Sequence, residues 1–494
     1  MNPLLLAYYG DDFTGSTDVM EALAGAGLRT VLFLDPPTPA RLRRYAGLRA
    51  FGIAGTSRTM TPTEMTRRLP PVFRALRAAG APVVHYKICS TFDSSPSVGS
   101  IGKAIEIAQG VFHAPFVPLL VGAPALGRYC AFGNLFARSG LDSEPQRLDR
   151  HPTMRHHPTT PMDEADLRLH LAKQTRRRIG LLDVLALEAP DTLRRLDRIR
   201  AEGAEILLLD VLNPRHLPRL GEVLSQPADP SRPALVVGSS CVEYALLAWW
   251  RRTGMPVPEP RSMKPKPDPT PALVVVSGSG SPVTDRQIQR ALEAGFAEVA
   301  VDTRGLADPR TRKAALRRAL SEATPHFLAV RSVIFHTARG PHDPRLARTA
   351  RALRARGRSS AEVLGTALGE LLAAALEQTG WRRAVVAGGD TSGFAARALG
   401  IEALEFAAPM TPGSPLCRIH APGRVADGRE IVFKGGQNGR DDFFLTALRG
   451  DASAVSGNRA DLAGGPRPSG LTARSRRATS RHSAKQTRID PAPH

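Results

Sequence analysis

Short runs of apolar residues, separated by stretches with helical periodicity, recur through most of this 494-residue chain. The runs are continuous, with no regular polar alternation, which is typical of strands buried on both faces. Strands that alternate with helices in this way indicate mostly parallel sheets. We therefore expect an α/β protein. Strands are predicted at residues 4–8, 30–34, 83–86, 117–121, 206–211, 235–237, 273–277, 298–302, 327–331, 384–387 and 431–433, and helices are predicted to begin near Thr160, Thr284, Asp308 and Ser359.

A proline-rich segment divides the chain. Residues 256–271 contain seven prolines in sixteen positions, and because proline fixes φ and lacks an amide donor, an extended linker is expected there. Residues 451–494 have few aliphatic side chains, so they are expected to be disordered. We predict two domains, residues 1–255 and 272–450, each with a mostly parallel sheet flanked by helices, followed by this tail.

The chain is strongly basic, with 67 Lys and Arg against 46 Asp and Glu, a formal net charge of +21. Such an excess is also a feature of nucleic-acid-binding proteins. Here, however, 59 of the cations are arginines scattered along the chain, and only the tail concentrates them, with eight Arg or Lys against three Asp. We therefore interpret the charge as a bias of composition and do not expect nucleic acid as the partner.

The cysteines and the N-terminus give information on the compartment. The four cysteines lie far apart with no CxxC pair, which argues against a disulfide framework or an ordinary zinc site. The N-terminal apolar run meets Asp11 and Asp12 too early for a signal peptide, and no apolar stretch is long enough to span a membrane. A cytoplasmic protein without a membrane partner is expected.

Polar residues follow the first predicted strand in the segment GDDFTGSTD, residues 10–18. Asp11 and Asp12 stand where the strand gives way to a helix, with the Thr14 hydroxyl close by. A carboxylate at the end of a strand can accept a proton from a substrate hydroxyl, and the helix N-terminus favours an anion. The alternative is that Thr14 or Ser16 caps the helix while the two acids complement its dipole.

A second polar segment, KICSTFDSSP at residues 87–96, follows another predicted strand. The Lys87 ammonium suits a carboxylate, and the Ser90 and Thr91 hydroxyls with Asp93 suit a polyol, so together they fit a small hydroxy acid. Arg58 offers a further donor to an anion. The alternative is a polar turn with an exposed lysine. Cys89 has no flanking histidine and is interpreted as a packed residue.

Three loops in the second half combine glycine with hydroxyl residues or a lysine, and each follows a predicted strand. Such loops allow close backbone approach and present amide groups to phosphate, which favours nucleotide binding. None matches a Walker A or GxGxxG pattern. They are SGSGS at residues 277–281, GGDTSG at 388–393 and KGGQNG at 434–439.

Histidines cluster in the RHP and RHHP segments at residues 150–152 and 155–158. Their spacing does not match a helical HxxxH metal motif, and the prolines indicate loops. A structural or substrate-contacting role is therefore the preferred interpretation.

Taken together and in this order, DDFTGSTD, KICSTFDS, RHHPTTPM, SGSGS, GGDTSG and KGGQNGRDDFF resemble the four-carbon acid sugar kinase family over roughly residues 4–448. The resemblance implies a substrate domain followed by a nucleotide domain. It also implies transfer of the ATP γ-phosphoryl group, with Mg²⁺, to the terminal hydroxyl of a tetronate or 3-oxo-tetronate. Residues 99–103 and 122–129 depart from the 3-oxo-tetronate branch, so the resemblance implies a reaction class and not one acid.

The family's functional positions can be carried over to this chain as expectations. In the first half they are a base at Asp12, assisted by Asp11, and substrate contacts at Thr14, Arg58, Lys87, Ser90, Thr91 and Asp93. In the second half they are ATP contacts at Ser277, Ser279, Ser281, Gly388, Gly389, Asp390, Thr391 and Gly436. Arg58 and Lys87 are expected to bind the substrate carboxylate. The metal ligands are not identified, and a homo-oligomer is possible within this scheme.

Two alternatives stay open from the residues alone. One is a phosphatase of the HAD-like kind with Asp11 or Asp12 as nucleophile, although DDFTG does not match its DxDGT motif. The other is a basic nucleic-acid-binding protein, which would show strongly salt-dependent binding through a contiguous basic face.

Overall fold

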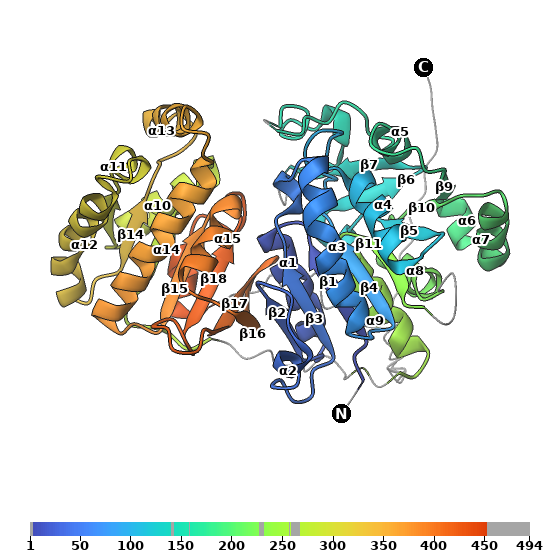
Figure 1. Ribbon diagram of the computed structural model, residues 1–494, viewed down its shortest axis with the longest axis horizontal. Coiled ribbons are helices and arrows are strands. Elements are labelled where there is room, and N and C mark those ends of the chain that lie inside the picture. The colour runs from blue at the N-terminus through green and yellow to red at the C-terminus, as the bar shows by residue number, and fades with distance from the viewer. Residues whose placement is uncertain are drawn as a thin grey trace, which may run out of the picture.

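A computed structural model describes residues 3–139, 143–157, 159–226, 232–255, 257 and 267–451. The chain is an α/β protein with two lobes, the N-terminal half on the right of Figure 1 and the C-terminal half on the left. Most of the predicted linker and all but the first residue of the predicted tail lie outside the described residues.

The N-terminal half contains a parallel block of eight strands. Seven of them are buried on both faces, as the continuous runs predict, whereas in the edge strand at residues 179–182 only Leu182 is fully buried. In sheet order the strands are β2 (Thr30–Phe33), β3 (Ala50–Ala54), β1 (Leu6–Gly10), β4 (Val83–Lys87), β11 (Ala234–Gly238), β5 (Val117–Leu120), β10 (Ile206–Leu209) and β9 (Ile179–Leu182). A separate small antiparallel sheet follows β5 and consists of β6 (Arg128–Ala131), β7 (Asn134–Ala137) and β8 (Gln146–Arg147).

The C-terminal half contains a parallel block of five strands and an antiparallel hairpin. The parallel strands, in sheet order, are β13 (Ala297–Ala300), β14 (Val333–His336), β12 (Val274–Ser277), β15 (Arg383–Ala387) and β18 (Glu430–Lys434). The hairpin consists of β17 (Ser414–His420), which pairs with β18, and β16 (Ala403–Thr411), which pairs with β2 of the other half.

The prediction of two separate sheets is wrong, because the β16–β2 pairing joins both blocks into one sheet of fifteen strands. Three antiparallel contacts lie between the blocks, so the two sets of parallel strands run in opposite directions. Six strand-to-strand steps separate β15 from β1, and at about 20–25° each they accumulate roughly 120–150° of twist. Antiparallel blocks in a flat sheet would point their carboxyl ends about 180° apart. The twist removes most of this difference in direction, so the loops at the carboxyl ends of both blocks can meet.

Helices cover both faces of the sheet (Figure 1). One hydrophobic cluster runs through both halves and includes side chains from α1, α9, α14 and α15; separate clusters fill the opposite face of each half. In the N-terminal half the helices are α1 (Phe13–Gly25), α2 (Pro39–Leu42), α3 (Pro62–Ala78), α4 (Ile101–Phe112), α5 (Leu167–Ala172), α6 (Val184–Glu188), α7 (Thr192–Ala201), α8 (Leu217–Leu224) and α9 (Cys241–Arg252), with 3₁₀ turns at Ser57–Thr59, Pro124–Leu126, Leu148–Arg150 and Pro214–His216. In the C-terminal half they are α10 (Pro282–Glu293), α11 (Thr303–Ala307), α12 (Arg312–Leu328), α13 (Pro344–Arg354), α14 (Ser360–Thr379), α15 (Gly389–Ala398) and α16 (Phe443–Arg449).

Two local predictions are wrong. The apolar run at residues 327–331 ends helix α12 and turns, with Leu328 and Val330 exposed by 81% and 54%, and the strand follows as β14. The helix predicted near Thr160 begins instead at Leu167, because the Asp166 carboxylate caps it by accepting from the Arg168 amide at 2.9 Å. The start predicted near Ser359 is confirmed, since that residue caps α14.

The helices within the described ranges are all too short or too polar to cross a lipid bilayer.

Candidate active site

Asp12 links strand β1 to helix α1. Its carboxylate caps the helix by accepting from the Gly15 amide at 2.8 Å and also accepts from the Thr14 hydroxyl at 2.7 Å. The alternative in which Thr14 or Ser16 caps this helix is therefore wrong, and Ser16 instead donates to the Asp12 carbonyl at 2.6 Å. Capping fixes the position of Asp12 and leaves Asp11 free to form another contact.

Arg58, from the turn after β3, holds both acids. Its Nη2 and Nε donate to Asp11 at 2.8 and 3.2 Å, and its Nη1 donates to Asp12 at 2.8 Å. Burial raises the pKa of Asp11 despite this partner. Burial also acts to raise the pKa of Asp12, but Arg58, Lys87 and the bonds from Thr14 and Gly15 outweigh it, so the net shift is downward. Asp12 is the more accessible of the two, with 17% of its side chain exposed against 3% for Asp11.

Lys87 ends strand β4 beneath the start of α1 and is only 3% exposed. A Cβ on Gly15 would lie 2.8 Å from the Lys87 Nζ and 2.4 Å from an Asp12 oxygen, so only glycine leaves room for this approach. The alternative of an exposed lysine is therefore wrong. Two carboxylates and two cations are gathered here, and their formal charges cancel.

The segment after Lys87 forms a short hydrogen-bonded loop. The Thr91 hydroxyl donates to Asp93 at 2.7 Å and lies 2.9 Å from the Cys89 sulfur. Ser90 is partly exposed in the same turn. Phe92 is fully buried at φ 58°, a conformation that bulky residues adopt rarely and that is found at functional sites. Burial raises the pKa of Cys89 to about 11, consistent with a packed residue and not a nucleophile.

The serine-rich loop after β12 is held by its own hydroxyls. The Ser277 hydroxyl accepts from the Ser279 amide at 3.4 Å, Ser279 accepts from Ser281 at 3.2 Å, and Ser281 caps α10 by accepting from Val283 at 3.2 Å. Ser277 is fully buried, Ser279 is 8% exposed and Ser281 is partly exposed. The outer two serines are thus better placed to meet a ligand.

The three glycine loops lie against one another at the carboxyl ends of the neighbouring strands β12, β15 and β18. A Cβ on Gly278 would lie 2.2 Å from the Thr391 hydroxyl, and one on Gly436 would lie 2.8 Å from the Ser279 hydroxyl. Gly388 is the N-cap of α15 and has φ 132°, a value that residues with side chains rarely adopt. Around Gly389, by contrast, no atom lies within 4 Å of a built Cβ. We call the three loops at residues 277–281, 388–393 and 434–439 the cradle; their backbones pack closely, and free space remains at Gly389.

A buried lysine supports this cradle from below. Lys434 is fully buried, and its Nζ lies 3.1 Å from the Thr284 hydroxyl, which donates to the Gly436 carbonyl at 2.8 Å. Among the described residues Lys434 has no ion-pair partner, and burial lowers its pKa to about 7. Sequence reasoning missed this contact because the lysine precedes the glycines and gives no signal of its burial.

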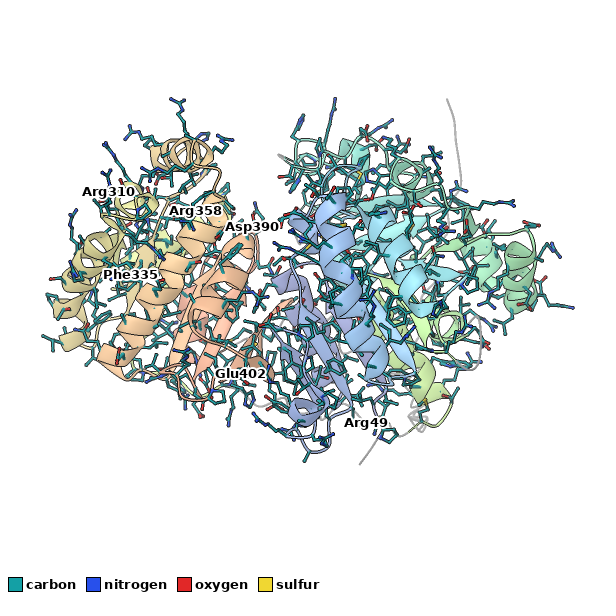
Figure 2. The ribbon with its side chains drawn as sticks, viewed as in Figure 1. Arg49, Arg310, Phe335, Arg358, Asp390 and Glu402 are labelled. Atoms are coloured by element: carbon teal, nitrogen blue, oxygen red, sulfur yellow. The ribbon has the colours of Figure 1, made fainter. Side chains whose placement is uncertain are left out.

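The acid pair and the cradle meet between the lobes. The centroid of the Phe13 ring, next to Asp12, lies 4.6 Å from the centroid of the Phe433 ring on β18. Asp390 has an exposed side, but the protein atoms around it reduce its hydration and raise its pKa; Arg58 acts to lower this pKa and Asp12 to raise it. A Cβ on Gly393, one turn after Asp390 in α15, would lie 3.8 Å from the Phe13 ring beside Asp12, so these charges lie close together across the two halves. Figure 2 shows Asp390 on the edge of the C-terminal half that faces the N-terminal half.

Beside these loops lie Arg128, which was not predicted as a site residue, and His157, which was predicted only to have a structural or substrate-contacting role. Arg128 begins β6 after strand β5; burial lowers its pKa, while the Asp93 carboxylate acts to raise it. His157 accepts from the Thr160 amide at 3.1 Å through Nδ1. Arg128 follows the carboxyl end of a strand, a signal that could have found it.

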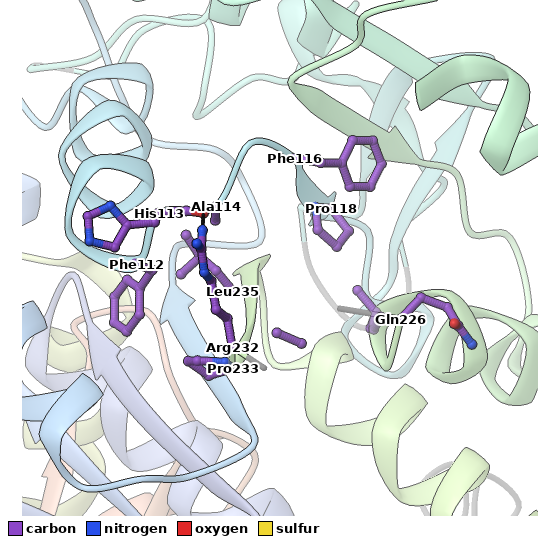
Figure 3. A pocket seen from close by; sticks show the side chains of 11 residues that line it. Phe112, His113, Ala114, Phe116, Pro118, Gln226, Arg232, Pro233 and Leu235 are labelled. Carbon is purple, nitrogen blue, oxygen red and sulfur yellow. Dashed lines mark hydrogen bonds between the residues drawn. The ribbon is translucent and has the colours of Figure 1, made fainter. Parts of the chain in front are cut away.

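The hollow shown in Figure 3 lies elsewhere. It is lined by residues such as Phe112, Phe116, Pro118 and Leu235, which lie at or near the start of strands β5 and β11. The acid pair and its partners lie at the opposite, carboxyl ends of the strands, so this hollow is not the candidate site.

No group of three or more His, Cys, Asp or Glu side chains in the described part of the chain could hold a metal ion. Mg²⁺ in phosphoryl-transfer enzymes is bound largely by phosphate oxygens and water with one or two carboxylates. Asp390 beside the cradle supplies one such carboxylate, so the residues present fit Mg²⁺ that arrives with a nucleotide.

Comparisons with known proteins agree with this division of the chain. Residues 6–246 match the family model for a sugar-binding N-terminal domain, and residues 274–444 match that for a nucleotide-binding C-terminal domain. A 3-oxo-isoapionate kinase of Paraburkholderia graminis is 46% identical over 89% of this chain and 93% of its own length. A 3-oxo-tetronate kinase of Cupriavidus necator is 31% identical over 90% and 96%.

A solved structure extends the likeness to three dimensions. The crystal structure of a Salmonella typhimurium LT2 protein is 27% identical to this chain, covers 90% of it and 98% of its own chain, and superposes with a TM-score of 0.71.

Proposed function

This chain belongs to the four-carbon acid sugar kinase family, whose members are ATP-dependent phosphotransferases, and we propose that it phosphorylates the terminal hydroxyl of a small sugar acid. The observation that carries the proposal is the contact between the start of α1, which Asp12 caps, and α15, whose first turn holds Asp390: a Cβ on Gly393 would lie 3.8 Å from the Phe13 ring. A kinase must bring an acceptor hydroxyl in line with the γ-phosphate, and this juxtaposition supports such an arrangement.

Asp12 is the proposed proton acceptor. Its lowered pKa keeps it ionised at neutral pH, and it is the more accessible member of the acid pair. A general base must lie within hydrogen-bond reach of the hydroxyl that it deprotonates. Asp11 is the positioning partner, because it engages two nitrogens of Arg58 and thereby fixes the third nitrogen on Asp12.

The cradle of the C-terminal half is proposed to bind ATP. Ser279, Ser281, Gly436 and the start of α15 at residues 388–391 supply hydroxyls, open backbone and a helix N-terminus, groups that suit phosphate. Ser277 is proposed to support the loop from inside, since it is fully buried. Asp390 would hold Mg²⁺, which when bound neutralises charge on the transferred phosphoryl group.

In the N-terminal half the proposed substrate contacts are Lys87, Ser90, Thr91, Asp93 and Thr14. Their hydroxyl and charged groups suit a polyhydroxy acid. The named relatives act on 3-oxo-isoapionate or 3-oxo-tetronate, and we propose an acid of this class, with a 4-phosphate as product.

The test is a coupled assay of ADP formation with 3-oxo-isoapionate, 3-oxo-tetronates, D-threonate and D-erythronate. We expect ADP release that depends on one or more of these acids, with one phosphorylated acid formed per ADP. ATP turnover that none of the acids stimulates would contradict the proposal.

A further inference from the structure

Arg58 is an unsuitable receptor for the substrate carboxylate. All three of its donor nitrogens already contact Asp11 or Asp12. The buried Lys87 ammonium provides the second positive charge beside these acids and acts to lower the pKa of each. Because two acids balance two cations, a substrate carboxylate entering here would meet no uncompensated positive charge.

Arg128 is a nearby arginine that lacks such compensation. Its Nη1 donates only to the Leu126 main-chain carbonyl, and its Nε is buried without a hydrogen-bond partner. No ion pair to Arg128 is formed among the residues that the structure describes. A partly buried guanidinium with unused donors is suited to bidentate binding of a carboxylate.

The position of Arg128 relative to the acid pair also fits a small acid. Strand β4, which leads into the polar loop at residues 89–93, lies between β1 and β5 in the sheet, and these strands run parallel with their carboxyl ends at one edge. The Asp93 carboxylate also acts to raise the pKa of Arg128. The polar loop at residues 89–93 therefore lies between Arg128 and the acid pair. Arg128 follows β5, three strand positions from β1 in the sheet, a separation of about 14 Å at the strands that the long arginine side chain shortens.

We propose that Arg128 binds the carboxylate of the sugar acid and so fixes its direction in the site. The acid end lies at Arg128, the middle hydroxyls meet Thr91 and Asp93, and the terminal hydroxyl reaches Asp12. This inference rests on the proposed function and assigns the carboxylate to Arg128 in place of Arg58.

The experiment compares the acid phosphorylated fastest in the coupled assay with its neutral amide, in the wild type and in Arg128→Gln. We expect kcat/KM for the acid to fall about 10²-fold in the variant, because charge-assisted contacts are lost. For the amide, kcat/KM should change less than about threefold, and KM for ATP should stay unchanged. Arg128→Lys keeps the positive charge but loses the two parallel N–H donors of the guanidinium. Its kcat/KM for the acid should lie between the values for the wild type and for Arg128→Gln.

Arg147→Gln is the matched control, because Arg147 lies on β8 of the same small sheet and pairs with Asp149 at a partly exposed position. It should behave as the wild type. If Arg128→Gln lowers kcat/KM equally for the acid and the amide, or lowers it for neither, the inference is overturned while the kinase proposal stands. If the wild type phosphorylates none of the acids, both fail. Should Arg128→Gln not fold, the acid-to-amide ratio of Arg128→Lys decides in the same way.

Discussion

The two regions that meet between the lobes solve different electrostatic problems. In the N-terminal half, Asp11, Asp12, Arg58 and Lys87 form a dense network of opposite charges. In the C-terminal half, the cradle uses serine hydroxyls, glycine backbone and one buried lysine. A site that handles a proton needs a fixed carboxylate, whereas a site that receives a polyphosphate must avoid fixed negative charge. Asp390, the acid at its edge, suits a metal ion.

The largest effect is expected at the acid pair. Asp12→Asn should keep the helix cap, since asparagine caps as well as aspartate, but should remove the proton acceptor and lower kcat by about 10²–10⁴-fold. Steady-state kinetics with the best acid measure this effect. Asp163→Asn, at an exposed pair with Lys173, is the control. Near-full turnover in Asp12→Asn would assign the base to another residue.

The next effect concerns a buried polar pair at the strand that ends at Lys87. Glu243, in the first turn of α9, contacts His85 on β4 at 2.6 Å, and both side chains are fully buried. Glu243→Ala should lower the free energy of unfolding by about 3 kcal/mol, because it leaves a buried polar partner unsatisfied. Denaturant titration measures the loss. The double variant His85→Leu with Glu243→Leu should recover part of it, and a further loss instead would show that the pair is not the cause.

In the cradle, by contrast, space and not charge is limiting. A methyl group on Gly278 would lie 2.2 Å from the Thr391 hydroxyl, and such overpacking costs about 1–3 kcal/mol. Gly278→Ala should therefore raise KM for ATP about tenfold or more while KM for the acid stays unchanged. Gly110→Ala, on α4 with no atom within 4 Å of the added methyl, is the control. An equal change in both KM values would show that the two regions are not separate.

The last effect is the smallest per pH unit and concerns Lys434, whose pKa is lowered by burial from 10.5 to about 7. Between these values the unfolded chain binds the proton and the folded chain does not, so this group makes stability rise with pH, by at most about 1.4 kcal/mol per pH unit. Below about pH 7 both states are protonated and the slope ends. Lys434→Met should lose this pH-dependent contribution. The measurement is the difference in unfolding free energy between the variant and the wild type from pH 7 to 10. A pH-independent difference would contradict the assignment.

The sequence predicted most of what depends on local pattern. The continuous apolar runs identified the buried parallel strands, and the polar segments at their carboxyl ends identified the loops that now meet. The strand predicted at residues 327–331 is wrong because the end of a helix and a buried strand can have the same apolar composition. Only the exposure of Leu328 and Val330 in the structure distinguishes the two. The single sheet depends on a long-range pairing of β16 with β2, which leaves no local signal.

The roles of the predicted site residues are a different matter. Asp12 and Gly389 belong to loops that the structure brings into proximity, as the sequence predicts, through Asp390 and Phe13. Arg58 was expected to bind the substrate carboxylate, which stays a prediction; in the structure its nitrogens contact the acid pair. Such pairing depends on the approach of β3 and β1 side chains, and residue type alone does not reveal which cation is already neutralised.

Single-turnover transfer from γ-labelled ATP tests the central claim most directly. With enzyme in excess over ATP and the sugar acid present, we predict that the label passes to the acid, and that Asp12→Asn slows this step without changing the Kd for ATP. If the label is released as inorganic phosphate at one rate whether or not the acid is present, the two regions do not serve one transfer, and the account is wrong.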